Sequence, residues 1–415
     1  MAPSLSRRSD ANLAGAQPVS TPRRIETLDA ARGLAVCGIV LLNVYNFSLP
    51  PAAYFNPASY GEHGPTTLAL WAVESIFAQD AFRAIFAMLF GAGIAIHFER
   101  RGTWRAHIAR MLVLLVIGYA HAVLLNNGDV LRLYALAGFL LPPLLRLSRR
   151  WLLVVVALLL AVHLGALGWF AWGWLRYWWD VRHGMGDPAA LVLWNSEFGS
   201  DPAAIEAGLA MGRETLGHRI ARRAFEWQGP LVIFLAFLPQ TLAAMVIGVW
   251  GWRSGLFGGQ WRRPSSRRVA VILASIALPP MIALCAAAFA SGFAGTVIGT
   301  TALVWSQPFA ILLGLSYVAG LFARWRGGPV PRGLPARLVA AGQLSLSNYI
   351  GASIVMAAIF HSWGLGWFGT VNRLEATLAA LLVIALILLL SPWWAARFGA
   401  GPFERLWRGG ALRLS

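Results

Sequence analysis

The fold is decided by the stretch RIETLDAARGLAVCGIVLLNVYNF, residues 24–47, which is apolar and long enough to cross a bilayer as a helix. Asp29 and Arg32 stand three positions apart, so they share a helix face and can form an ion pair. Asn43, roughly three turns further on, returns to that face. Because polar groups in lipid usually face a bundle interior or a wet cavity, we expect this face to point inward. The alternative is an Asp29 that complements the helix dipole and an Asn43 that only packs.

The composition is that of a multi-pass membrane protein. Of 415 residues, 58 % are hydrophobic and 12 % are charged, which predicts an all-α, polytopic bundle of membrane helices. All 34 basic residues are arginine, and the net charge is +17. Most arginines lie in short loops between apolar runs, so the charge indicates topology, and no nucleic-acid partner is expected. Cys37 and Cys285 both fall in apolar segments, so neither a disulfide framework nor a metal site is predicted.

About ten transmembrane helices are predicted, because ten apolar segments reach the roughly 17–25 residues that a crossing requires. A shorter stretch, Thr67–Gln79, is expected to lie in the interface or to prolong the second helix. The ten segments are Leu34–Leu49, Asp80–Phe98, Ile108–Leu125, Val130–Leu147, Trp151–Trp174, Pro230–Gly251, Val269–Phe289, Thr301–Ala323, Leu338–Phe360 and Leu374–Ser391.

Arginine alternates between the loops that join these segments. One set is arginine-rich and consists of loops 1–33, 99–110, 146–150, 252–268 and 324–337, together with the tail from Arg397. The other set holds no arginine except Arg373 and consists of loops 50–67, 126–129, 291–300 and 361–373. By the positive-inside rule, both termini are predicted to be cytoplasmic. We therefore expect a multi-pass protein of the bacterial cytoplasmic (inner) membrane.

Four parts follow along the chain. Residues 1–23 are rich in Ser, Ala, Arg and Pro and are expected to form a disordered N-terminal arm. Residues 24–175 hold helices 1–5, and residues 229–410 hold helices 6–10. Between them, residues 176–228 form a long loop, expected to be external, with an amphipathic helix over Ala203–Phe225.

A second polar signal lies where the third and fourth helices meet. His121 is followed by a turn with Asp129, and then by Arg132 and Tyr134. A tight turn would bring His121 to Asp129, and a histidine oriented by a carboxylate is the usual arrangement of a general base. Because a base must reach its substrate, both side chains are expected to line a cavity open to the external side. The alternative is an Asp129–Arg132 ion pair beside a histidine of the core. If His121 is not the base, His63 is the next candidate.

Two further helices carry polar groups inside apolar segments. Asp80 and Arg83 begin the second helix three positions apart, and the glycines that follow Phe90 would let another backbone approach closely. Asn348 and Tyr349 lie in the first turns of the ninth helix. Small and hydroxylated residues also join membrane helices, so packing is the alternative reading of this last group.

The pattern resembles the YeiB family of bacterial membrane proteins, whose members carry a DUF418 domain. The similarity extends over nearly the whole chain. The matching residues are Arg24, Leu28 to Gly33 and Asn43; Phe86, Leu89, Phe90 and Gly91; His121, Asp129 and Tyr134; Gly342, Ser347, Asn348 and Tyr349; and Gly401 to Arg408. The family often has Lys at the position of Arg83 and Trp at that of Arg405.

The Asp-x-x-Arg-Gly opening is also similar to that of the transmembrane acyltransferase superfamily, which includes the heparan glucosamine acetyltransferase and sugar O-acyltransferases. This resemblance implies an acyl-CoA donor, often acetyl-CoA, that enters from the cytoplasm, and an acceptor on the far side. No tightly bound cofactor is expected. The expected partners are membrane lipid, a small-molecule, glycan or lipid acceptor, and a second copy of the chain in a homodimer.

The first functional hypothesis is therefore a membrane acyltransferase with His121 as base and Asp129 as its orienting partner. Arg32, paired with Asp29, would bind donor phosphates. The amides of Asn43 and Asn348 would stabilise a developing oxyanion. The residues expected to bind donor or substrate are Asp29, Arg32, Asn43, Asp80, Arg83, Arg132, Tyr134, Asn348 and Tyr349. The alternative hypothesis is a transporter or lipid flippase that uses the same polar track without chemistry.

Overall fold

The computed structural model describes residues 25–100, 102–226 and 228–414. Within these ranges the chain forms helices joined by turns and contains no β-strand, which confirms the all-α prediction. The predicted N-terminal arm, residues 1–23, lies outside the described residues.

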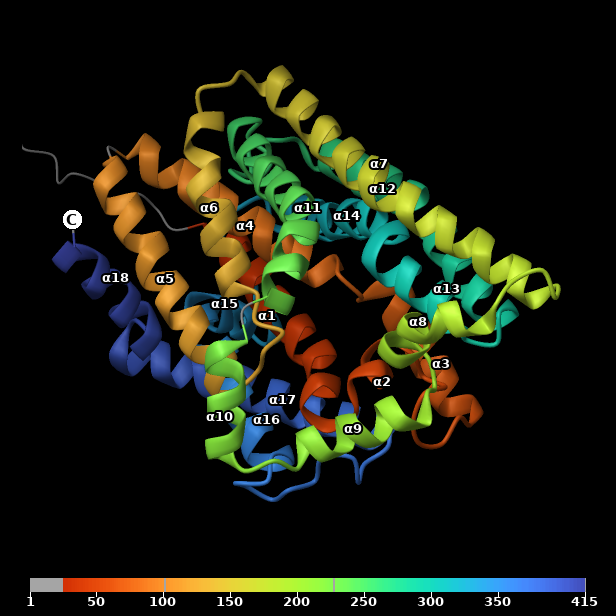
Figure 1. Cartoon of the computed structure of the whole chain (residues 1–415). Coiled ribbons are helices and arrows are strands. Elements are labelled where there is room, and N and C mark those ends of the chain that lie inside the picture. Colours follow the sequence, from red (N-terminus) through yellow and green to blue (C-terminus); the bar gives the residue numbers. More distant parts are fainter. Residues whose placement is uncertain (1–24, 101, 227, 415) are drawn as a thin grey trace, which may run out of the picture.

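The helices follow one another from α1 to α18, with a 3₁₀ helix (η1) and a π-helical turn (η2) among them (Figure 1). They are α1 (Glu26–Ser48), α2 (Pro51–Phe55), α3 (Pro65–Phe77), α4 (Ala81–Glu99), α5 (Trp104–Leu124), α6 (Leu131–Leu144), α7 (Arg149–Arg182), η1 (Pro188–Leu191), α8 (Val192–Phe198), α9 (Pro202–Gly212), α10 (Leu216–Phe225), α11 (Gln228–Arg253), α12 (Arg263–Ala290), α13 (Gly295–Thr300), η2 (Thr301–Trp305), α14 (Gln307–Trp325), α15 (Leu334–Gln343), α16 (Ser345–Phe360), α17 (Arg373–Phe398) and α18 (Pro402–Leu414).

Each of the ten predicted segments coincides with a helix or a bent pair of helices. Among the described residues, eight spans are long and apolar enough to cross a membrane, and the pair α15 and α16, bent by 92°, makes a ninth. The tenth segment is α6, which has 14 residues and ends at Pro142 and Pro143. At 1.5 Å per residue α6 is only about 21 Å long, so it is shorter than the hydrocarbon core. The stretch Thr67–Gln79 does prolong the second span, as α3.

The first helix occupies the centre of the bundle. In its most apolar window 78 % of the residues are buried, against 22 % for α7 and 17 % for α12. Figure 1 shows α1 near the middle and α7 along the edge. An apolar helix that other helices surround contacts little lipid, so α1 can carry polar groups at low cost, whereas the exposed faces of α7 and α12 must be apolar.

Glycines let the central helices cross closely. A side chain at Gly33 would collide with the carbonyl of Leu338, and one at Gly342 would collide with the carbonyl of Asp29. The crossing of α1 and α15 therefore depends on both glycines. A similar crossing joins α4 and α11, because a side chain at Gly91 would meet the backbone of Met245. The prediction that a glycine after Phe90 permits close approach is confirmed by this contact.

The helix ends lie on two opposite sides of the bundle. On one side, Arg253 of α11 lies 3.9 Å from Glu99 of α4 and donates to the carbonyls of Leu145 and Leu147 beyond α6. We call this the arginine-rich side, since the arginine-rich loops meet there. On the opposite side, Arg373 of α17 donates to a carboxylate oxygen of Glu74 at 2.9 Å.

The connection between α7 and α11 differs from the prediction in two ways. Helix α7 continues to Arg182, eight residues beyond the expected end at Trp174. The prediction of a single amphipathic helix over 203–225 is wrong, because the segment forms two helices. The first, α9, ends at Gly212, and Thr215 starts α10 by accepting a hydrogen bond from the backbone N–H of His218. This N-cap explains the division into two helices.

Candidate functional site

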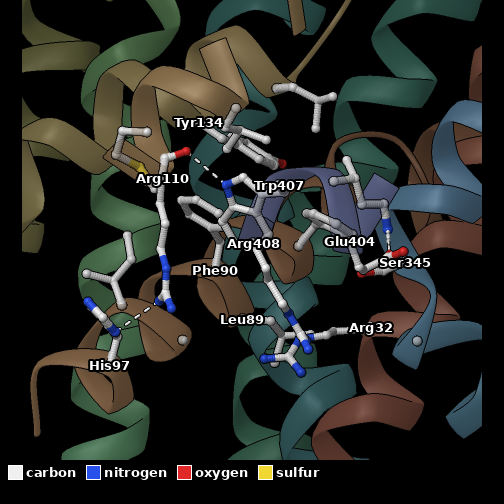
Figure 2. A pocket seen from close by; sticks show the side chains of 18 of the residues that line it. Arg32, Leu89, Phe90, His97, Arg110, Tyr134, Ser345, Glu404, Trp407 and Arg408 are labelled. Carbon is white, nitrogen blue, oxygen red and sulfur yellow. Dashed lines mark hydrogen bonds between the residues drawn. The ribbon is translucent and has the colours of Figure 1, made fainter. Parts of the chain in front are cut away.

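A cavity of about 240 Å³ opens among seven helices and reaches from the arginine-rich side into the bundle. Figure 2 shows its charged and aromatic side chains extending from different helices. The lining comprises Arg32 of α1; Phe86, Leu89, Phe90, Gly93, Ile94 and His97 of α4; His107, Arg110, Met111 and Leu114 of α5; Leu131 and Tyr134 of α6; Gly342 and Gln343 of α15; Ser345 and Leu346 of α16; and Glu404, Trp407 and Arg408 of α18.

Cations gather in the outer part of this cavity. Arg32 lies 2.9 Å from Asp29, whose side chain is buried, while 28 % of the Arg32 side chain stays exposed. Arg110 donates to Nδ1 of His97 at 2.9 Å. Arg408 is exposed and extends from α18 (Figure 2). Within the described part of the chain, Arg32 is the one of these three arginines with an ion pair to a carboxylate, so this part of the cavity is suited to an anion.

The inner part is aromatic and apolar. The rings of Phe90 and Trp407 stack with centroids 6.4 Å apart, and Phe90 and Phe86 both stack on Tyr134. Trp407 is fixed by its indole N–H, which donates to the carbonyl of Arg110 at 2.8 Å. The cavity therefore changes from cationic to apolar along its depth, as a ligand with an anionic head and an apolar tail requires.

Helix α18 closes one wall through a buried carboxylate. Glu404 accepts hydrogen bonds from the backbone N–H groups of Leu346 at 2.8 Å and Ser347 at 3.1 Å, and from the Ser347 hydroxyl. These donors belong to the first turn of α16, whose own cap residue supplies no side-chain hydrogen bond. The carboxylate thus satisfies the free N–H groups of α16 and holds α18 against the bundle.

The predicted pair at the mouth of α1 is present, but the two amides differ from expectation. Asp29 and Arg32 form the ion pair that their spacing predicted. Asn43 is buried but does not line the cavity. Asn348 donates to the carbonyl of Ala341 at 2.9 Å and to the hydroxyl of Ser391 at 3.0 Å. Both amide hydrogens of Asn348 are thereby used, so its expected role as oxyanion donor is not supported.

Asp80 and Arg83 are also paired, but around a separate, very small cavity of about 10 Å³. Gln307 donates to Asp80 at 2.6 Å and accepts from Arg83 at 3.0 Å. Tyr134 lines both cavities, and its hydroxyl donates to the carbonyl of Arg83 at 2.8 Å. Its ring therefore separates the Asp80–Arg83 pair from the large cavity.

The expected contact between His121 and Asp129 is confirmed. Nδ1 of His121 lies 3.0 Å from Oδ1 of Asp129, without an aligned hydrogen bond. Asp129 also accepts the backbone N–H of Arg132 at 2.9 Å, and the hydroxyl of Tyr349 approaches it at 3.5 Å. The two side chains are 1 % and 0 % exposed, and neither lines the cavity. The expectation that they face a cavity open to the external side is wrong, because both side chains are buried and α10 covers the adjoining end of α5.

Two bacterial proteins are similar to this chain along nearly its whole length. The uncharacterized protein YeiB of Escherichia coli (strain K12) is 28 % identical over 399 residues, which cover 94 % of this chain and 96 % of YeiB. The uncharacterized protein YxaH of Bacillus subtilis (strain 168) is 25 % identical and covers 94 % of this chain and 95 % of its own length. Residues 251–413 match the family described as protein of unknown function, DUF418. The chain is therefore similar to YeiB-like proteins along nearly its whole length, and its C-terminal part matches the DUF418 family.

The DUF418 segment supplies only part of the cavity. It contains α12 to α18, and thus Ser345, Glu404, Trp407 and Arg408. Arg32 and Arg110 lie outside it. The alignment with YeiB, which leaves out only 6 % of the chain, includes both halves. The cavity is consequently a feature of the complete YeiB-like chain.

The sequence alone did not predict much of the cavity lining. His107, Arg110, Glu404, Trp407 and Arg408 were not among the predicted site residues, although all line it. The arginines of the loops and of the tail were already explained by membrane topology, so they carried no separate signal. Among the described residues, no group of three or more His, Cys, Asp and Glu side chains is arranged to hold a metal ion.

On the opposite side, α10 covers the ends of α5 and α16. Arg223 donates to the carbonyls of Ala122 and Leu125 at 3.4 and 3.2 Å, which satisfies carbonyl groups at the end of α5. Glu214 binds Arg222 at 2.6 Å and Arg219 at 3.4 Å. Burial raises the pKa of Glu214, but the hydrogen bond and charge of Arg222, with those of Arg219, outweigh it and bring the pKa below its usual value.

Proposed function

We propose that this protein is an acyltransferase-like enzyme of the bacterial inner membrane. In this proposal the arginine-rich side is cytoplasmic, an acyl-CoA enters the cavity there, and the acyl group passes to an acceptor on the external side. The observation that carries the proposal is the cavity itself, which is cationic outside and apolar inside. An acyl-CoA has the same polarity, with phosphates at one end and an acyl thioester at the other.

The cavity residues suit the two ends of this donor. Arg32, Arg110 and Arg408 can bind phosphate oxygens, and a guanidinium group does so as a planar, bidentate donor. The walls that Phe90 and Trp407 form can enclose the pantetheine and acyl parts. Such a donor binds reversibly as a substrate, so no tightly bound cofactor is required.

The proposed base lies just beyond the inner end of the cavity. Leu131 lines the cavity and follows Asp129 by two residues, and Leu114 lines it two helical turns before His121. Two turns are roughly 11 Å. In this proposal, a local movement of the side chains between Leu114 and His121 brings the acyl group within hydrogen-bond reach of His121.

The proposal is tested by calorimetric titration of detergent-purified protein with acetyl-CoA and with a longer acyl-CoA. We expect saturable binding that Arg32→Ala abolishes and that Arg110→Ala or Arg408→Ala weakens about tenfold, equivalent to ~1.4 kcal/mol. Arg105→Ala and Arg405→Ala are matched controls on α5 and α18, since both arginines are exposed and neither lines the cavity. If no acyl-CoA binds, the enzyme proposal is wrong.

A transporter or lipid flippase is the second candidate function. The bent pair α15 and α16 favours it, because broken helices often form the substrate sites of transporters. Gly342, Gln343 and Ser345, at this bend, line the cavity. Reconstitution in liposomes distinguishes the two functions: movement of an anionic amphiphile without acyl transfer supports transport.

A further inference from the structure

A serine hydroxyl completes the His121–Asp129 pair. Oγ of Ser353, on α16, lies 2.9 Å from Nε2 of His121, on α5. The other ring nitrogen of His121 is the one that lies 3.0 Å from Asp129. The three residues are 1 %, 3 % and 3 % exposed. A hydroxyl, an imidazole and a carboxylate in this order are the geometric signature of an activated serine nucleophile.

We propose that Ser353 is the nucleophile that accepts the acyl group from the donor and passes it to the acceptor. This inference rests on the proposed function, because it requires an acyl thioester to reach the site. It makes the transfer a two-step reaction through a covalent acyl-enzyme.

The contacts around the three residues fix their roles. The Ser353 hydroxyl donates to the carbonyl of Tyr349 at 3.1 Å, whereas the donor in its 2.9 Å hydrogen bond with Nε2 of His121 depends on the tautomer of the imidazole. Rotation of the hydroxyl toward Nε2 makes the imidazole its proton acceptor. Asp129 is itself held by the backbone N–H of Arg132. The contact between His121 and Asp129 is close but not aligned, as is common for catalytic groups before substrate binds.

The neighbouring helices place this triad next to the inner end of the cavity. Leu346 lines the cavity and precedes Ser353 by seven residues on α16, just as Leu114 precedes His121 on α5. Residues seven apart lie on one helix face, two turns or roughly 11 Å from each other. Tyr349 stands between them, with its ring centroid 4.9 Å from that of His121. A turn of the Tyr349 side chain would connect the cavity with the triad.

The two steps balance with the groups present. Oγ of Ser353 attacks the thioester carbonyl while Nε2 of His121 takes the hydroxyl proton. The carbon–sulfur bond breaks, and the leaving thiolate takes this proton from His121 to give the free thiol. The acceptor hydroxyl or amine then attacks the serine ester and gives a proton to His121. The ester bond breaks, and Oγ of Ser353 recovers the proton.

The test is mass spectrometry of the purified full chain after incubation with acetyl-CoA without acceptor. We expect one acetyl group per chain, on the α16 peptide that contains Ser353. Ser353→Ala and His121→Gln should lose the label, and Ser353→Cys should regain it as a thioester that hydroxylamine cleaves. Ser316→Ala is the matched control, because Ser316 is also buried and donates only to a carbonyl, that of Ala270.

Titration with acetyl-CoA on the same samples separates the possible failures. Donor binding with no label on Ser353 overturns the nucleophile and leaves the proposed function intact. Label that persists in Ser353→Ala, on another residue, also overturns it. Absence of donor binding overturns the proposed function and this inference together. A Ser353→Ala protein that unfolds is replaced in the comparison by Ser353→Cys, whose hydroxylamine-sensitive label decides the same question.

Discussion

Asp29 and Arg32 show what one ion pair contributes within α1. The Asp29 side chain is 2 % exposed to solvent, whereas the Arg32 side chain is 28 % exposed and lines the cavity. Asp29→Asn is expected to destabilise the protein by ~1–3 kcal/mol, less than the ~3–5 kcal/mol of a fully buried pair because Arg32 is partly solvated. Thermal unfolding in detergent of Asp29→Asn, Arg32→Gln and the double variant measures the coupling. A coupling energy of zero would contradict the prediction.

His361, at the end of α16, makes stability depend on pH. Burial lowers the pKa of His361 from 6.5 to about 3, helped by the charges of Arg219 and Arg223. The folded state thus keeps His361 neutral where the unfolded chain protonates it. The free energy of unfolding is therefore highest above pH 6.5 and falls progressively toward pH 3, by up to ~1.4 kcal/mol per pH unit.

Thermal unfolding between pH 7.5 and 5 checks this dependence. The midpoint should fall as the pH falls, and His361→Gln should flatten the curve. His183 is the control, since it is exposed on the same side. If the pH dependence of the unfolding midpoint is unchanged in His361→Gln but flattened in His183→Gln, the prediction for His361 is wrong.

At the scale of the helix, close crossings depend on single glycines. Gly33→Ala and Gly342→Ala should each destabilise by ~1–3 kcal/mol, because the added methyl group would meet the backbone of the opposite helix. Gly351→Ala in α16 is the control: nothing lies within 4 Å of the added atom, so the higher helix propensity of alanine should stabilise the chain slightly. Unfolding midpoints compare the three variants, and equal effects would refute the role of the α1–α15 crossing.

The helices differ in how far their sequence predicted them. The apolar runs that became α5 and α12 were readily recognised, because hydropathy is a local property. The division of the 203–225 segment depended on one cap residue, Thr215, within a continuous amphipathic pattern. The docking of α18 depended on Glu404 reaching the first turn of α16, 58 residues away from Leu346. Contacts of that kind cannot be read from local composition.

The candidate site is a property of the whole molecule for the same reason. The spacing of Asp29 and Arg32, and the short turn between His121 and Asp129, placed each pair correctly within one or two helices. Ser353 lies 232 residues from His121 in the chain, so its role became visible only when α16 packed beside α5. Long-range packing, not local pattern, assembles the cavity and the triad.

The arginine-rich loops predict the orientation of the whole molecule in the membrane. The arginine-rich loops meet on one side, as the contact between Arg253 and Glu99 shows, and the positive-inside rule places that side in the cytoplasm. Ser265, in the first turn of α12, and Ser200, before α9, are both exposed, and the sequence predicts them on different sides of the membrane. In intact cells, an impermeant maleimide should label Ser200→Cys and should label Ser265→Cys only after the cells are opened. Cys37 and Cys285 are buried, which keeps the background low. The reverse labelling pattern would show that the molecule has the opposite orientation. The cationic cavity would then open outside the cell, where cytoplasmic acyl-CoA could not enter it.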